Sequence, residues 1–334
     1  MGNIHQLCDL SEARVLAGEA PNQQAMRGIA FDSPAETQER EDGFKKGWNS
    51  LVKVALAQTP IGRVLGHVPL IEKAYTYHAL RRTNYAGLFA GVYESYAAAL
   101  RHIPASRNRG WDNQESAQIW LSKIDHMQPA AYAPFFWLWK VLREGSTIVD
   151  YGGSIGLSYY SYTARRPLPP SVRWIVVEVP HLVSAGKQVA RREAATQLYF
   201  ESDLRAVPPC DILFSAGALQ YVEESVAGVL EKLSTRPTHI LINKLPLTTG
   251  RGYWTLQNFG TAVSPYRVYN EREFLGYFEA AGYFLRDRWS VSELSCSVPF
   301  HPECFVPTFS GFHFEMRSQL GAPGVIVNRV VPPA

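Results

Sequence analysis

From Ser146 onward, short apolar runs alternate with amphipathic stretches, and this alternation constrains the fold more than any other feature of the chain. Helices are predicted between the runs, for example at His181–Ala195 and Glu223–Leu233. Strands that alternate with helices favour a mostly parallel sheet covered on both faces. The predicted strands are Thr147–Tyr151, Trp174–Val179, Gln197–Phe200, Cys210–Ser215 and Thr238–Leu245.

The pattern changes after the fifth run. A loop is predicted at Pro246–Tyr269, and Asn270 is placed to cap a helix over Glu271–Ala281. Two further apolar runs follow, Tyr283–Val291 and Gly311–Arg317, with no helix between them. We therefore expect these two runs to form an antiparallel pair at the edge of the sheet.

The chain before this region divides by charge. Residues 1–42 are acidic and poor in large apolar side chains, which predicts a partly disordered arm. Residues 43–111 are basic and are expected to form helices that act as a lid or in oligomerisation, with Gly91–Leu100 as a turn into a short helix. The basic helix either packs on its own domain or lies on an anionic membrane. Residues 112–317 then form the sheet domain, and residues 318–334 form a tail.

Composition excludes several other classes of protein. With 46% hydrophobic and 12% aromatic residues among 334, the chain is too apolar to be disordered throughout. A net charge of +3 is too weak to indicate nucleic-acid binding, and no apolar stretch reaches the roughly 20 residues of a membrane span. Four scattered cysteines fit neither a disulfide framework nor a zinc site. A cytoplasmic protein with reduced thiols and no metal is predicted.

A glycine turn follows the first predicted strand. Residues Ile148–Gly156 read IVDYGGSIG, in which a buried run ends in an acid and then enters a glycine-rich turn before a helix. Such a turn lets a ligand approach the backbone closely, and the helix start offers unpaired N–H groups. The turn is neither a phosphate-binding loop nor G-x-G-x-x-G, which counts against a dinucleotide-dependent dehydrogenase.

Acidic residues follow the next two predicted strands. Glu178 stands near the end of the second, where a carboxylate accepts hydrogen bonds from a ribose diol, and Asp203 follows the third, where it would face an adenine amino group. The fourth strand ends at small residues from Ala216. Together with the glycine turn, this order of motifs predicts a nucleoside site at the switch point of the sheet.

These motifs resemble those of class I S-adenosylmethionine-dependent methyltransferases, over roughly residues 112–317. The matching segments are Asp150–Gly156, Glu178, Ser202-Asp203 and Phe214–Tyr221. The resemblance implies a doubly wound, seven-stranded Rossmann-like sheet whose last strand is inserted antiparallel, and S-adenosylmethionine as the cofactor. A narrower resemblance is to a family of bacterial methyltransferases of unassigned substrate, often encoded beside polysaccharide or small-molecule biosynthesis genes. The segments that carry this narrower resemblance are Gly91–Leu100, Leu241–Leu247, Tyr266–Phe274 and Trp289.

The resemblance implies a role for each residue of the cofactor motifs. Glu178 would bind the ribose hydroxyls, and Asp203 with Leu204 would hold the adenine. Ser215 and Ala216 would lie beneath the sulfonium. Asp150 would orient the glycine turn or contact the amino group of the cofactor, and Gly152, Gly153 and Gly156 would line its methionine and ribose portions.

The methyl acceptor is less defined by the sequence. A hydroxyl acceptor needs a base within hydrogen-bond reach, whereas a carboxylate needs only a cation to hold it. Candidate catalytic residues are His181, Lys244 and His301, the last in an insertion, Ser292–Ser310, that would fold over the pocket. Many relatives carry His where Gln220 stands, and Gln cannot act as a base. The candidate substrate-binding residues are Tyr160, Gln220, Tyr253, Trp254, Arg267 and Tyr269.

We therefore expect a methyltransferase that acts on a small molecule and favours O-methylation of a hydroxyl or carboxylate on a sugar or secondary metabolite. Two alternatives stay open at this point. One is N-methylation of a small metabolite, and the other is a non-catalytic scaffold that retains the fold. The expected partners are the small-molecule acceptor and a second copy of the chain in a homodimer, without nucleic acid or stable membrane insertion.

Overall fold

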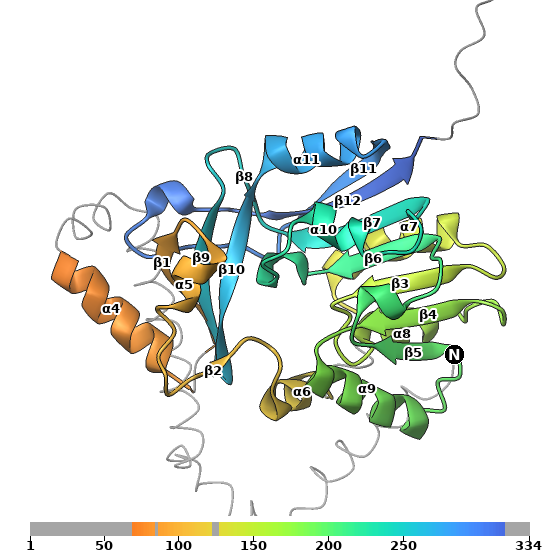
Figure 1. The fold of residues 1–334 in the computed structure, drawn as a ribbon, viewed down its shortest axis with the longest axis horizontal. Coiled ribbons are helices and arrows are strands. Elements are labelled where there is room, and N and C mark those ends of the chain that lie inside the picture. Colours follow the sequence, from red (N-terminus) through yellow and green to blue (C-terminus); the bar gives the residue numbers. More distant parts are fainter. Residues whose placement is uncertain (1–68, 84–85, 122–126, 318–334) are drawn as a thin grey trace, which may run out of the picture. The chain divides into compact units, whose positions relative to one another are not determined.

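The computed structural model describes residues 69–83, 86–121 and 127–317, which all belong to one compact unit. The predictions for the acidic arm, for residues 43–68 and for the C-terminal tail lie outside the described residues. Within them, two sheets are formed (Figure 1).

The larger sheet has seven strands in the order β11-β12-β7-β6-β3-β4-β5. Strands β5, β4, β3, β6 and β7 run parallel to their neighbours, whereas β12 is antiparallel to both β7 and β11. The predicted doubly wound sheet with an inserted antiparallel last strand is confirmed. The strands are β3 (Thr147–Tyr151), β4 (Arg173–Val177), β5 (Leu198–Glu201), β6 (Ile212–Ala216), β7 (His239–Leu245), β11 (Tyr283–Val291) and β12 (Phe309–Met316).

Helices cover both faces of this sheet, and alternate strand residues point to opposite cores. In β4, Trp174 and Val176 pack with α7, α8 and α9, while Ile175 and Val177 pack with α10 and α11. The helices are α4 (Pro69–Arg81), α5 (Tyr96–Leu100), α6 (Gln114–Leu121), α7 (Tyr132–Val141), α8 (Leu157–Thr163), α9 (Pro180–Arg192), α10 (Val226–Glu231) and α11 (Glu271–Ala280). Single 3-10 turns are η2 (Pro129–Ala131), η3 (Leu204–Ala206), η4 (Leu219–Tyr221) and η5 (Pro302–Cys304).

The second sheet corrects two predictions. The expected loop Pro246–Tyr269 holds most of a hairpin of two long strands, and the expected turn at Gly91 lies inside a strand. Tight chain reversal at Gly260, where φ is +93°, joins the hairpin strands. The sheet has the order β1-β9-β10-β2, with β8 also paired to β10. Its strands are β1 (Ala86–Tyr93), β2 (Asn108–Arg109), β8 (Leu247–Thr248), β9 (Tyr253–Phe259) and β10 (Ala262–Asn270).

Both faces of the second sheet are covered, which explains its apolar sequence. Trp254 of β9 packs with α4 and α5, whereas its neighbour Tyr253 packs with Val298 and Val306 of the insertion after β11. The insertion therefore supports the second sheet, and none of its described residues lines the cavity described below.

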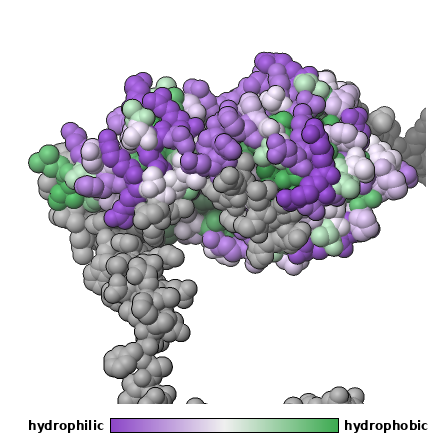
Figure 2. All heavy atoms as spheres, turned by 90° about the horizontal axis from the view of Figure 1, so that it is seen from below, coloured by the Kyte–Doolittle hydropathy of each residue, from purple (hydrophilic) through white to green (hydrophobic). Residues whose placement is uncertain are grey.

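The surface of the described part is mostly hydrophilic on the side seen in Figure 2. Large apolar side chains that are strongly exposed include Leu70 on α4 and Phe136 on α7. No helix in the described ranges is long and apolar enough to pass through a bilayer.

Candidate functional site at the switch point of the sheet

A cavity of about 620 Å³ lies at the carboxyl ends of β3, β4 and β6. The chain runs from β3 outward to β4 and β5 on one side, and from β6 to β7 on the other. The cavity therefore lies at the topological switch point, where open α/β sheets bind their ligands. It is lined by Tyr96, 109–112, Trp120, 150–154, Leu157, Ser158, 177–180, Leu182, Ser202, 216–218, Tyr221, Val222, Lys244 and Ser264.

The glycine turn after β3 forms part of this lining. Gly152 has φ +73°, and a Cβ at this position would lie 2.0 Å from the Cβ of Ala218. A Cβ on Gly153 would lie 2.4 Å from the carboxylate carbon of Asp150. Only glycine fits at both positions, so the turn brings bare backbone to the cavity wall.

Asp150 lies directly beneath this turn and is fully buried. One carboxylate oxygen accepts a hydrogen bond from the indole N–H of Trp174 at 3.1 Å, and the other has no hydrogen-bond partner among the described residues. Burial, together with the nearby charge of Glu178, raises the pKa of Asp150 to about 7. The carboxyl thus offers an unsatisfied buried oxygen next to the turn.

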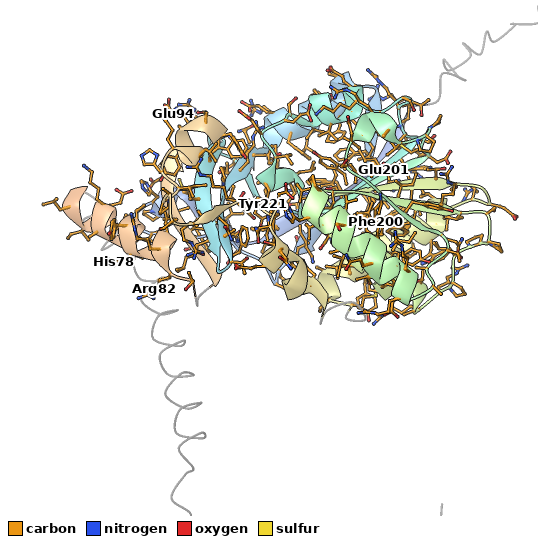
Figure 3. All side chains as sticks on the ribbon, turned by 60° about the horizontal axis from the view of Figure 1, so that its bottom comes forward. His78, Arg82, Glu94, Phe200, Glu201 and Tyr221 are labelled. Atoms are coloured by element: carbon orange, nitrogen blue, oxygen red, sulfur yellow. The ribbon has the colours of Figure 1, made fainter. Side chains whose placement is uncertain are left out.

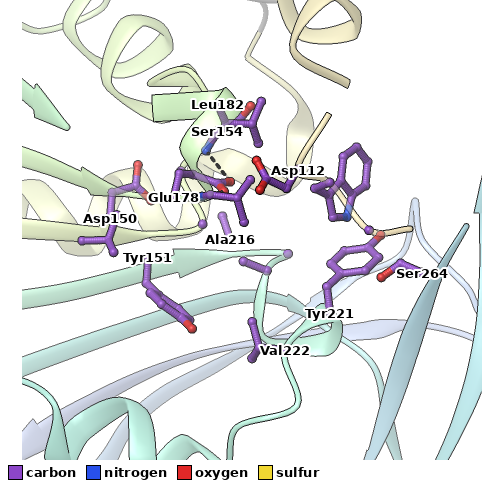
Figure 4. A pocket seen from close by; sticks show the side chains of 18 of the residues that line it. Asp112, Asp150, Tyr151, Ser154, Glu178, Leu182, Ala216, Tyr221, Val222 and Ser264 are labelled. Carbon is purple, nitrogen blue, oxygen red and sulfur yellow. Dashed lines mark hydrogen bonds between the residues drawn. The ribbon is translucent and has the colours of Figure 1, made fainter. Parts of the chain in front are cut away.

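Glu178 follows β4 and faces the same turn (Figure 4). Its Oε1 accepts a hydrogen bond from the N–H of Ser154 at 3.1 Å, and its Oε2 accepts one from the N–H of Val179 at 2.8 Å. Burial raises the pKa of Glu178 to about 7, although the two backbone donors favour the ionised form.

Asp112 brings a third carboxylate to this end of the cavity, next to Glu178 (Figure 4). Its Oδ1 accepts hydrogen bonds from the backbone N–H of His181 at 3.0 Å and lies 2.8 Å from the Nδ1 of the same residue. The contact holds the segment that enters α6 against the start of α9.

The end of β6 has only small side chains. Ala216, Gly217 and Ala218 line the cavity, and the Oγ of Ser215 donates to the carbonyl oxygen of Tyr151 at 3.0 Å, away from it. Small residues at this point leave room for a ligand between the acidic end of the cavity and the second sheet.

One wall of the cavity is aromatic. Trp111 stacks on Phe259 of the second sheet, with ring centroids 3.8 Å apart, and contacts Trp120 and Tyr221 by ring edges or at a tilt. Tyr221 lies between the two sheets (Figure 3) and donates to the side-chain oxygen of Gln257 at 2.6 Å. Ser264 of β10 completes this wall beside Tyr221 (Figure 4).

Lys244 reaches the cavity from β7. It is one of the few non-glycine residues with positive φ, at +59°, a conformation that costs a lysine about 1 to 2 kcal/mol. Its Nζ donates to the Oε1 of Gln128 at 2.8 Å, and Gln220 donates to its carbonyl oxygen at 3.4 Å. These contacts hold the residue in this conformation at the cavity edge.

The remaining residues of the predicted cofactor set do not line the cavity. Gly156 caps α8 at φ +93°, and Asp203 caps η3 by accepting from the N–H of Arg205. Leu204 is buried in the core beside α10, and Ser215 bonds to the strand next to it. Ser202, one residue before Asp203, lines the cavity instead.

Most of the predicted acceptor-binding residues contact other parts of the protein rather than the cavity. Tyr160 is buried in the core around α8, and Tyr253 donates to the carbonyl oxygen of Cys304. Arg267 lies over the rings of Trp254 and Tyr269, and Tyr269 donates to the carbonyl oxygen of Leu219 at 2.7 Å. None of these residues lines the cavity, and neither does Gln220.

The two predicted histidines also lie outside the lining. His181 has 55% of its side chain exposed and bonds to Asp112. His301 bonds to Glu72 of α4, with its Nε2 3.0 Å from the carboxylate. The structure thus brings together Asp150, Gly152, Gly153, Glu178, Ala216 and Lys244 among the predicted residues.

Sequence reasoning missed the segment Arg109–Asp112, as well as Tyr221 and Ser264. The available signal for the segment was a tryptophan between a glycine and an aspartate. No comparable signal marked Ser264, because it lies in a strand that was not predicted.

No protein-family model matches the chain, and no curated protein sequence matches it. Solved structures share parts of its fold. The 1,6-didemethyltoxoflavin-N1-methyltransferase of Burkholderia thailandensis, with bound 1,6-didemethyltoxoflavin and S-adenosylhomocysteine, is 19% identical over 67% of this chain and 89% of its own, with a TM-score of 0.41. The magnesium protoporphyrin IX methyltransferase of Synechocystis with S-adenosylhomocysteine is 12% identical over 62% and 96%, with a TM-score of 0.43. An S-adenosylmethionine-dependent methyltransferase of Aquifex aeolicus is 16% identical over 61% and 99%, with a TM-score of 0.39.

Proposed function

We propose that the protein is an S-adenosylmethionine-dependent methyltransferase that acts on a small molecule. The observation that carries the proposal is the cavity at the switch point, where Glu178, the glycine turn and the small end of β6 face one another. Each of these features lies at the carboxyl end of a strand, where open α/β sheets bind their ligands.

The residues at this point fit such a cofactor. The carboxylate of Glu178 is placed to accept hydrogen bonds from ribose hydroxyls, and the bare backbone at Gly152 and Gly153 allows close approach. The unpartnered oxygen of Asp150 below the turn is a further acceptor for a polar group. Ser202 at the end of β5 extends the same side of the site toward the adenine.

The protein contributes mainly orientation and exclusion of water. When bound, S-adenosylmethionine would supply a methyl group whose carbon the acceptor atom attacks in line with the bond to the sulfonium sulfur, which leaves. Positioning the acceptor supplies much of the rate of such a step. Ala216, Gly217 and Ala218 leave the space needed, and Trp111 with Tyr221 covers it on the side of the second sheet.

Two features favour a small acceptor. The cavity volume of about 620 Å³ lies in the range of small-molecule sites. The aromatic wall is made of packed rings, two of which, Trp111 and Phe259, come from segments outside the larger sheet. We assign this aromatic side to the acceptor and favour transfer to oxygen.

Isothermal titration with S-adenosylmethionine, S-adenosylhomocysteine and NAD tests the proposal. We expect binding of the two sulfur compounds, no binding of NAD, and a loss of affinity in Glu178→Ala. The exposed Glu193→Ala variant on the far end of α9 serves as the control, with unchanged affinity. No binding of either sulfur compound by the wild-type protein would refute the proposal.

A further inference from the structure

The charges that line the cavity are divided between its two sides. Asp112, Asp150 and Glu178 lie at the β3 and β4 side. The cations Lys244 and Arg109 come from elsewhere, Lys244 from the end of β7 and Arg109 from β2 of the second sheet. By strand order, a ligand that spans the cavity meets the acids that follow β3 and β4 at one end and Lys244 of β7 at the other.

Strand order sets the separation between these groups. Glu178 follows β4, and three strand spacings of about 4.8 Å lead from β4 through β3 and β6 to β7, or roughly 14 Å. The stem of Lys244 runs beside Gly217, since a Cβ at Gly217 would lie 3.6 Å from the Cβ of Lys244. Lys244 thus stands one strand beyond the small residues where the methyl group would be presented.

The conformation of Lys244 is costly and is maintained by its surroundings. Its φ of +59° is one that glycine, asparagine or aspartate adopts more readily, yet a lysine stands at this position. Gln220 and Gln128 bond to its carbonyl oxygen and to its ammonium, respectively. Strained residues of this kind cluster at functional sites, and an ammonium carries three N–H donors.

Asp112, the chain neighbour of Trp111, is the carboxylate next to the acceptor side, and it is already engaged by His181. The other lining residues of this side include Tyr96, Arg109, Trp111, Tyr221, Lys244 and Ser264, and no histidine is among the described lining residues. The phenol of Tyr221 already donates to Gln257, and burial raises its pKa above the ordinary value. A hydroxyl acceptor would need a proton removed, whereas a carboxylate is already ionised at neutral pH.

We propose that the acceptor is the carboxylate of a small aromatic or apolar acid, held by the ammonium of Lys244 with Arg109 adding positive charge; this inference rests on the proposed methyltransferase function. The aromatic wall receives the apolar body of the acid. A carboxylate oxygen attacks the methyl carbon, the methyl–sulfur bond breaks, and its electron pair stays on sulfur. The products are a methyl ester and S-adenosylhomocysteine, and no proton is transferred.

Binding measurements test the charge preference without turnover. Isothermal titration of the protein saturated with S-adenosylhomocysteine uses benzoate, phenylacetate and octanoate, each paired with its neutral amide. We expect at least one acid to bind about tenfold or more tightly than its amide. Lys244→Met should abolish the preference, Lys244→Arg should retain part of it, and Lys187→Met, which removes an exposed cation from α9, should leave it unchanged.

Thermal unfolding of each variant shows whether it is folded. The variant Arg109→Met is a second test of whether positive charge in the cavity causes the preference for acids over amides. It should reduce the preference without touching the strained backbone of β7. Equal affinity for every acid and its amide, or no detectable binding of any acid at about 1 mM, would overturn the assignment.

A turnover experiment identifies the atom that is methylated. The probe 4-hydroxybenzoate carries a carboxylate and a phenol on one ring, and the donor is S-adenosylmethionine with a tritiated methyl group. We expect a product that releases volatile labelled methanol under mild alkali, as methyl esters do. A base-stable ether, or no product, would contradict the assignment.

The outcomes separate this inference from the function beneath it. If S-adenosylhomocysteine does not bind, the proposed methyltransferase function fails. If it binds but the acids show no advantage over their amides, only the carboxylate assignment fails.

Discussion

The carboxylate of Glu178 accepts a hydrogen bond from the backbone N–H of Ser154, so the end of β4 is tied to the glycine turn that follows β3. The two segments are 24 residues apart in the chain. Because the donor belongs to the turn itself, the side chain both shapes the turn and faces the cavity. This double role makes Glu178 the most informative position for testing the site.

Replacing Glu178 by Gln removes the charge and keeps the size. We expect the dissociation constant for S-adenosylmethionine to rise about 10- to 100-fold, since hydrogen bonds to a charged group contribute about 1.5 to 3 kcal/mol. Isothermal titration measures the change. Glu193→Gln, exposed at the end of α9, is the matched control, and an unchanged dissociation constant in Glu178→Gln would assign ribose binding to another residue.

The raised pKa of Glu178, about 7, predicts a pH dependence of cofactor binding. The ionised carboxylate is the better acceptor for hydroxyl donors, so binding is linked to loss of its proton. Affinity should therefore rise as pH increases through 7 and level off above it, and at pH 6 it should be about tenfold below the plateau. Titrations between pH 5.5 and 8 check this, and Glu178→Gln should show a flatter profile than the wild-type protein.

A side chain at position 152 should damage the turn. Gly152→Ala places a Cβ 2.0 Å from that of Ala218 and forces alanine to adopt φ +73°. We expect a loss of about 2 kcal/mol or more in the free energy of unfolding, together with weaker cofactor binding. Denaturant unfolding and titration measure the two effects.

Gly276→Ala is the control for the glycine substitution. Gly276 lies on the exposed side of α11, where an added Cβ meets open space. Alanine should stabilise this helix by about 0.5 to 1 kcal/mol and leave cofactor binding unchanged. Equal effects of the two substitutions would mean that the turn tolerates a side chain.

Acid stability should depend on His313, which is buried in β12 beside His239 and the ring of Trp137. Burial, helped by the charges of His239 and Arg286, lowers the pKa of His313 to about 4. The unfolded chain takes up this proton near pH 6.5, earlier than the folded one. The stabilisation is thus complete above pH 6.5 and is lost as pH falls toward 4, with a slope of up to about 1.4 kcal/mol per pH unit.

Chemical denaturation at several pH values measures this slope. His313→Gln should reduce it between pH 4 and 6.5, although the variant is less stable at neutral pH because it leaves a buried polar group in a new environment. His102→Gln is the control, since His102 is exposed on the loop after α5. A slope that stays the same in His313→Gln would mean that carboxyl groups elsewhere cause it.

The larger sheet could be predicted because its strands are buried on both faces and read as continuous apolar runs. Such runs are Thr147–Tyr151, which the glycine turn follows, and Arg173–Val177, which Glu178 follows. The acid and glycine motifs of the site lie at these ends, so their convergence in space follows from strand order alone. Lys244 was found for the same reason.

The second sheet was not predicted because its sequence contains both features that favour a hairpin and a feature that argues against a long strand. Pro265 lies within β10, and a proline normally argues against a long strand. The Gly260-Thr261 pair between two aromatic runs was the available hairpin signal. Since Trp111 is positioned by Phe259 and Ser264 lies on β10, the aromatic side of the site could not be derived without this sheet.

The pairing of β1 with β9 joins segments far apart in the chain, as the contact between Thr255 and the carbonyl oxygen of Ala90 shows across 165 residues. During synthesis at 5 to 20 residues per second, β1 must wait roughly ten to thirty seconds before its partner leaves the ribosome. Leu88 and Phe89, buried in the finished protein, are without that partner for the whole interval. The ribosome-bound chain thus exposes an apolar strand without its partner, and slow translation lengthens the time in which such a strand can aggregate.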